Sequence, residues 1–136
     1  MRTLLNIIWL VLSGIWLALG YLVAGVIMCL LIITIPFGIA SFRMAAFALW
    51  PFGNVIVAKP GAGVGSGIMN ILWFLLCGWW LALGHLVTAV ALAVTIIGIP
   101  LALGNLKMIP VSLVPFGKAI VPVAALRPDM QVLYRT

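Results

Sequence analysis

The sequence predicts an all-α integral membrane protein built from two tandem parallel repeats, each a helical hairpin, with four membrane spans in total. Three observations support this fold class: a duplication inside the chain, an apolar composition and the positions of the basic residues. Of the 136 residues, 67% are hydrophobic and 6% are charged, whereas soluble domains contain about 25% charged residues. So few charges cannot cover the surface of a water-soluble fold, and the composition therefore predicts a membrane protein.

The duplication consists of a 52-residue segment that occurs twice, offset by 64 positions and without a gap. Residues 6–57 and 70–121 are identical at about 24 of these aligned positions. A Gly-rich segment lies between the copies, and such a composition is typical of a flexible linker. The predicted organisation is a single membrane domain (1–136) made of repeat 1 (4–57), the linker (58–67), repeat 2 (68–121) and a cytoplasmic tail (122–136).

Each repeat holds an apolar run that is too long for one crossing. Residues 4–42 and 68–106 contain no acidic or basic side chain except His85. A single helix of that length would measure roughly 58 Å against a hydrocarbon core of about 30 Å, so two short spans per repeat fit better. We expect the chain to reverse near Gly20 and near Gly84, because glycine adopts turn conformations without a Cβ clash.

The basic residues determine the predicted orientation. With two spans per repeat they all fall on one side, which the positive-inside rule makes the cytoplasm. Both termini are then cytoplasmic and the repeats are parallel. With one span per repeat the halves would be inverted, and the equivalent residues Arg43 and Lys107 would face opposite sides. A re-entrant segment is the third option, because Pro36 and Pro100 interrupt the helical hydrogen-bond ladder.

Features that both repeats share are interpreted as scaffold. Tryptophans recur at 9 and 16 and again at 73 and 80, and tryptophan favours the membrane–water interface. Recurring small residues predict close helix contacts. Pro-Phe-Gly after each second span predicts a turn, and the β-branched residues that follow predict a short cytoplasmic strand. The proposed repeat scaffold comprises Trp16, Trp80, Gly20, Gly84, Pro36, Pro100, Pro51, Phe52, Gly53, Pro115, Phe116 and Gly117.

Two segments carry a resemblance to a known family. One is Gly-Trp-Trp-Leu-Ala-Leu-Gly-His-Leu at 78–86 with Thr-Ile-Ile-Gly-Ile-Pro at 95–100, and the other is the Pro-Phe-Gly…Ile-Val ending of each repeat. The chain resembles the YccF-like family of small bacterial inner-membrane proteins over nearly its whole length, although repeat 1 departs from the first motif at Ile15, Tyr21 and Thr34. The resemblance implies the inner membrane of a bacterium, and it implies no enzymatic activity.

The sequence lacks the side chains that most catalytic and ion-coupling sites need. Asp129 is the single carboxylate side chain, so one chain cannot form a carboxylate pair or an acidic ring. Buried acidic residues are also the usual proton and sodium sites of transporters. Cys29 and Cys77 show no metal-binding or disulfide spacing. We therefore predict that the protein is not an enzyme, and we expect no cofactor, metal or nucleic-acid partner.

Four residues are candidates for more than a structural role. Arg43 and Lys107 are interpreted as anchors that bind anionic lipid head groups, or as basic residues at the cytoplasmic mouth of an oligomeric pore. His85 stands opposite Tyr21 when the repeats are aligned. It is interpreted as an interfacial residue at the periplasmic hairpin, with a pH-sensitive group as the alternative because histidine titrates near neutrality.

The sequence supports two functional hypotheses from different classes. The first is a non-enzymatic structural or accessory component of the inner membrane that forms homo-oligomers or joins a larger membrane complex. The second is a passive channel formed by a homo-oligomer, which would prefer anions because the net charge is +6. The expected partners are other copies of the chain and membrane lipids whose anionic head groups lie at the cytoplasmic face.

Overall fold

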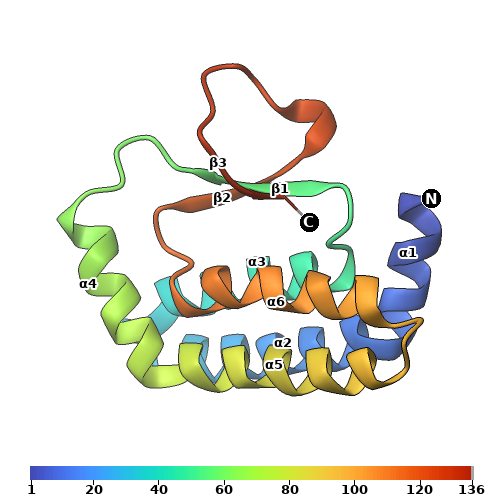
Figure 1. Cartoon of the computed structure of the whole chain (residues 1–136). Coiled ribbons are helices and arrows are strands. Elements are labelled where there is room, and N and C mark those ends of the chain that lie inside the picture. Colours follow the sequence, from blue (N-terminus) through green and yellow to red (C-terminus); the bar gives the residue numbers. More distant parts are fainter. Residues whose placement is uncertain (136) are drawn as a thin grey trace.

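The computed structural model describes residues 1–135 and arranges them as two layers of helices beneath a small antiparallel sheet (Figure 1). Helices α2 and α5 form the layer far from the sheet, and α3 and α6 lie between that layer and the sheet. Helices α1 and α4 rise toward the sheet at opposite ends of the molecule. The helix bounds are α1 Arg2–Trp9, α2 Ile15–Leu30, α3 Ile35–Leu49, α4 Val64–Trp73, α5 Trp79–Val94 and α6 Ile99–Leu113.

Both repeats follow the same order of elements, which confirms the predicted helical tandem repeat. In each, a short helix leads through a π-helical segment, Leu10–Gly14 or Phe74–Gly78, into a long helix. The bend between α1 and α2 lies at the first of these segments (Figure 1). By length and apolar composition, Arg2–Leu30, Ile32–Leu49 and Val64–Val94 could each cross a membrane, whereas α6 is shorter.

The predicted positions of the chain reversals are wrong. Gly20 lies inside α2 and Gly84 lies inside α5, and the chain reverses instead between α2 and α3 and between α5 and α6. The true turns come directly before Pro36 and Pro100, which occupy the first turn of α3 and α6, where the missing N–H has no helical partner to lose. The two glycines serve packing rather than turning, because they lie where α2 and α5 meet.

In each reversing turn a threonine hydroxyl donates a hydrogen bond to a carbonyl near the end of the preceding helix. The two threonines are at non-equivalent positions, but the carbonyl groups that accept are equivalent. Thr34 Oγ1 donates to Met28 O at 2.5 Å, and Thr95 Oγ1 donates to Leu92 O at 2.7 Å. Met28 and Leu92 are equivalent in the two repeats. The last carbonyl groups of a helix lack intrahelical donors, and each threonine hydroxyl supplies one.

The first tryptophan of each repeat is buried in the core, whereas the second is exposed. The indole N–H groups of Trp9 and Trp73 donate to backbone carbonyls of α3 and α6, at 2.6 and 2.7 Å. In contrast, Trp16 is 71% exposed and Trp80 is 63% exposed. The π-helical segment between each pair widens the turn, so residues seven positions apart no longer share one face.

The Pro-Phe-Gly segments fasten the strands to the first helix of each repeat. The Asn6 side chain accepts from Phe52 N at 2.9 Å and donates to Phe52 O at 2.8 Å. Asn70 forms the same pair with Phe116, at 2.9 and 3.0 Å. The glycine that follows has a positive φ in both copies, 103° and 80°, which explains why glycine is needed there.

The sheet joins the two repeats and the C-terminal segment. Its strand order is β2–β1–β3, and both pairings are antiparallel. The segment predicted as a linker is partly helical, because α4 begins at Val64. The strand bounds are β1 Asn54–Ala58, β2 Lys118–Pro122 and β3 Val132–Arg135.

An approximate two-fold axis relates the two repeats. Residues that are 64 positions apart meet each other at two levels of the molecule. Ile56 pairs with Ile120 in the sheet, and Tyr21 bonds to His85 between α2 and α5. The axis therefore runs from the sheet through both helix layers.

Candidate functional site

The structure places three of the four candidate residues in two separate sites, and Lys107 lies outside both. Tyr21 and His85 belong to a buried group on the two-fold axis, which we call the axial cluster: Ser13, Tyr21, His85, Asn105 and Ser112. Arg43 lines a depression between α3 and β2, which we call the sheet hollow: Arg43, Ala46, Phe47, Trp50, Asn54 and Ile120.

The axial cluster is a continuous chain of hydrogen bonds between α2, α5, α6 and the first π-helical segment. His85 Nδ1 lies 2.9 Å from Asn105 Oδ1, and His85 Nε2 lies 3.0 Å from the Tyr21 hydroxyl. Because the amide oxygen can only accept, we assign the proton to Nδ1, and Nε2 then accepts from Tyr21. Asn105 Nδ2 donates to Ser13 Oγ at 3.2 Å, and the Tyr21 hydroxyl lies 2.5 Å from Ser112 Oγ.

The axial cluster is closed and inaccessible. Each of its five side chains has 0% exposed surface. Within residues 1–135, no buried side-chain nitrogen or oxygen lacks a hydrogen-bond partner. The described chain also contains no group of three or more His, Cys, Asp or Glu side chains that could hold a metal. The cluster therefore fixes how the two repeats pack, as satisfied polar groups do between membrane helices.

The predicted position of His85 at a periplasmic hairpin is wrong. His85 lies within α5, because the chain reverses ten or more residues later, between α5 and α6. Its side chain faces the two-fold axis, where it contacts Tyr21. Tyr21 occupies the equivalent position in the aligned repeats, and the structure brings the two side chains into contact. Sequence reasoning missed Ser13 and Ser112. One feature of the sequence could have indicated them: each serine replaces a less polar residue of the other repeat. Ser13 is equivalent to Cys77, and Ser112 is equivalent to Ala48.

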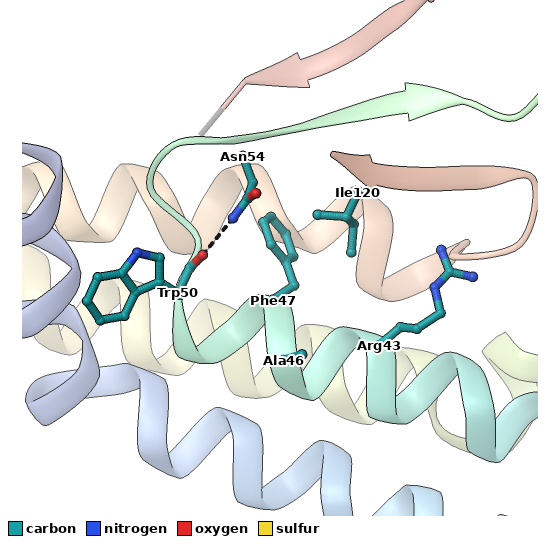
Figure 2. A pocket seen from close by; sticks show the side chains of 6 residues that line it. All are labelled: Arg43, Ala46, Phe47, Trp50, Asn54 and Ile120. Carbon is teal, nitrogen blue, oxygen red and sulfur yellow. Dashed lines mark hydrogen bonds between the residues drawn. The ribbon is translucent and has the colours of Figure 1, made fainter. Parts of the chain in front are cut away.

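The sheet hollow has a volume of about 300 Å³ and lies at the boundary between the apolar helices and the charged sheet. Figure 2 shows Arg43 at one end of the hollow and Trp50 with Asn54 at the other, with Phe47 and Ile120 between them. Arg43 Nη2 donates to Lys118 O at 3.0 Å, and Asn54 Nδ2 donates to Trp50 O at 2.8 Å. The guanidinium is thus held in place by the backbone of β2.

The equivalent region of repeat 2 is arranged differently. Lys107 is exposed on α6, as its equivalent Arg43 is on α3, and the difference lies at position 118. Lys118, the equivalent of Asn54, donates to Pro110 O at 3.3 Å and lies 5.8 Å from the centre of the Tyr134 ring. Burial lowers the pKa of Lys118 below its ordinary value, because a partly buried ammonium loses hydration. The Lys118 side chain therefore crosses the space that is open in repeat 1.

Comparison with known proteins agrees with this architecture of two related halves. The inner membrane component domain, YccF, matches the chain twice, over residues 4–54 and 68–118. The inner membrane protein YccF of Escherichia coli (strain K12) is 35% identical over 132 residues, which cover 90% of this chain and 89% of that protein, and the Shigella flexneri protein of the same name matches equally. No solved structure matches the chain significantly. With both repeats matched and this identity over nearly its full length, the chain belongs to the YccF family of inner membrane component domains.

Proposed function

We propose that the protein is a non-enzymatic structural or accessory component of the inner membrane, and that it acts as a homo-oligomer or within a larger membrane complex. The observation that carries this proposal is the separation of charge from apolar surface. The buried polar groups satisfy each other, so the chemistry available to a partner lies on the surface alone. That surface offers a basic sheet on one side and exposed apolar side chains elsewhere.

The charge is concentrated around the sheet. Arg43 donates a hydrogen bond to a carbonyl of β2, and Arg135 lies in β3. The Arg2 side chain lies beside Gly53, directly before β1, with its Cδ 3.6 Å from where a Cβ on that glycine would stand. Helices α2 and α5, on the far side, contain no acidic or basic residue apart from His85. By the positive-inside rule, the sheet and both termini would face the cytoplasm.

This distribution supports insertion with the two-fold axis along the membrane normal, so that both repeats enter from the sheet side. Helix α1 and the π-helical segment after it contain 8 and 5 residues, which extend roughly 20 Å at 1.5 Å per residue, less than the hydrocarbon core of about 30 Å. The turns after α2 and α5 lie at opposite ends of the molecule (Figure 1). At these turns, Ile33 is 92% exposed and Ile97 is 88% exposed. We therefore favour re-entrant hairpins with both turns in lipid over four spans with a hydrated loop in each repeat.

Cysteine labelling tests this topology. In a background in which Cys29→Ala and Cys77→Ser copy the other repeat, single cysteines at Lys59 and Met130 should react with an impermeant maleimide in inverted vesicles but not in intact cells. Cysteines at positions 33 and 97 should stay unreactive on both sides, because lipid surrounds them. Labelling of either turn from outside would support four spans and overturn the re-entrant arrangement, and labelling of 59 and 130 on opposite sides would overturn the common orientation of the repeats.

An anion channel is the second function that the basic face supports, and conductance separates the two. Purified protein in planar bilayers should carry no more current than protein-free membranes if it is a structural component. Native mass spectrometry from lipid nanodiscs would report the number of copies in the same preparation. Reproducible anion-selective currents that change in Arg43→Gln/Lys107→Gln would contradict the structural role and support the channel.

A further inference from the structure

We propose that the sheet hollow binds the head group of an anionic phospholipid, with the Arg43 guanidinium as the group that holds the phosphate. This goes beyond the proposed structural role, and it requires only that the hollow lies at the level of the lipid head groups. The charge of Arg43, the shape and lining of the hollow, and the contrast between the two repeats support such a site.

Among the side chains of residues 1–135, Arg43 has no carboxylate partner. Asp129 is the single acidic side chain, and it lies 3.5 Å from Arg127 in an exposed ion pair. The hydrogen bond from Arg43 to Lys118 O occupies one guanidinium nitrogen. A guanidinium carries several N–H donors in a planar fork that matches the oxygens of a phosphate group. Arg43 is therefore held in position by β2 and keeps donors for an anion from outside the protein.

The lining of the hollow fits the part of a phospholipid where phosphate meets glycerol. Ala46, Phe47 and Ile120 provide an apolar floor, while Trp50 and the Asn54 amide lie at the end opposite Arg43 (Figure 2). Trp50 is 43% exposed, and tryptophan side chains favour the level of the head groups. A phosphate at Arg43 would leave the glycerol and the first acyl carbons over the apolar floor. A small inorganic anion would use only one end of the hollow.

In repeat 2, the Lys118 side chain extends across the region that corresponds to the sheet hollow. Five of the six residues that line the hollow in repeat 1 differ at the equivalent positions of repeat 2, and Ile56 alone matches its equivalent, Ile120. The replacements are Arg43 by Lys107, Ala46 by Pro110, Phe47 by Val111, Trp50 by Val114 and Asn54 by Lys118. The Lys118 ammonium reaches the Pro110 carbonyl, so the protein's own cation lies where the open space is in repeat 1. The two repeats therefore have different capacities, and the proposed lipid site belongs to repeat 1.

Native mass spectrometry of the full chain in detergent, with added dioleoylphosphatidylglycerol or dioleoylphosphatidylcholine, tests the site. The wild-type protein should retain one phosphatidylglycerol and much less phosphatidylcholine. Arg43→Gln should reduce the retained phosphatidylglycerol about tenfold, since it removes a charge-assisted hydrogen bond. Ala46→Phe keeps the charge but fills the hollow, and it should cause a similar loss. Lys107→Gln is the matched control, because it removes the equivalent charge outside the hollow, and it should bind as wild type.

Several results would overturn the proposal. Equal losses in Lys107→Gln and Arg43→Gln would mean that phosphatidylglycerol is attracted by net charge alone. Retention unchanged in Ala46→Phe would remove the hollow from the site. Displacement of the lipid by millimolar inorganic phosphate would assign the hollow to a free anion. Circular dichroism and elution volume must match the wild type for each variant, and the labelling experiment above reports on insertion independently of lipid retention.

Discussion

Replacing Gly38 by alanine is expected to destabilise the α2–α3 hairpin by about 1–3 kcal/mol, and adding Cys29→Ala should restore much of the loss. A Cβ atom at Gly38 would collide with Cys29 Sγ and lie 2.9 Å from Gly25 O. Repeat 2 has already made both changes, with Ala102 and Ala93 at the equivalent positions. At this contact, repeat 1 combines the smallest residue, glycine, with the larger cysteine, whereas repeat 2 has alanine at both positions.

Reversible unfolding in mixed micelles, followed by circular dichroism, measures this effect. The control is Gly65→Ala, because nothing lies within 4 Å of the Cβ position at Gly65 and alanine favours a helix over glycine. It should leave stability equal to or slightly above that of the wild type. If Cys29→Ala and Gly38→Ala destabilise additively, then crowding between α2 and α3 is not the reason for the glycine.

Replacing Asn105 by leucine is expected to lower the free energy of unfolding by about 1–3 kcal/mol. The change removes the acceptor of the His85 Nδ1–H group and the donor to Ser13 Oγ. These groups are fully buried, so water cannot replace the lost partners. The cost comes mainly from leaving a buried donor unsatisfied rather than from the strength of the original bond.

The same unfolding measurement compares this variant with Thr88→Val and with Ser13→Ala. Thr88 Oγ1 donates only to Gly84 O of its own helix, so its removal should change stability by no more than about 0.5 kcal/mol. Ser13→Ala should cost less in the Asn105→Leu background than in the wild type, because the two residues share one hydrogen bond. Equal costs in both backgrounds would show that the axial cluster does not act as a connected unit.

The helical repeat could be predicted from the sequence because duplication and composition are properties of the whole chain. The positions of the reversing turns could not be predicted in this way, because a glycine can indicate either a turn or a close contact between helices. Gly20 and Gly84 permit the approach of α2 and α5, and only the prolines that begin α3 and α6 marked the true turns. The error at His85 followed directly, since a residue assigned to a hairpin was assigned to the interface.

The candidate sites were predictable to different degrees. The sequence showed that Tyr21 and His85 are equivalent, but their contact could not be predicted, because it depends on where the two-fold axis passes between the repeats. The sheet hollow was beyond sequence reasoning, since it depends on how β2 lies over α3. It also depends on a difference in side-chain length between Asn54 and Lys118, whose effect appears only after the strands are placed.

The order of strands in the sheet has a consequence for biosynthesis. The central strand β1 belongs to the first half of the chain, but both of its neighbours come from the last part, β2 and β3. When repeat 1 has left the ribosome, β1 therefore has two unpaired edges, because β2 and β3 are still to be made. Val55, Ile56 and Val57 are almost completely buried in the finished protein. These residues must stay unpaired until β2 and β3 have been made and can complete the sheet.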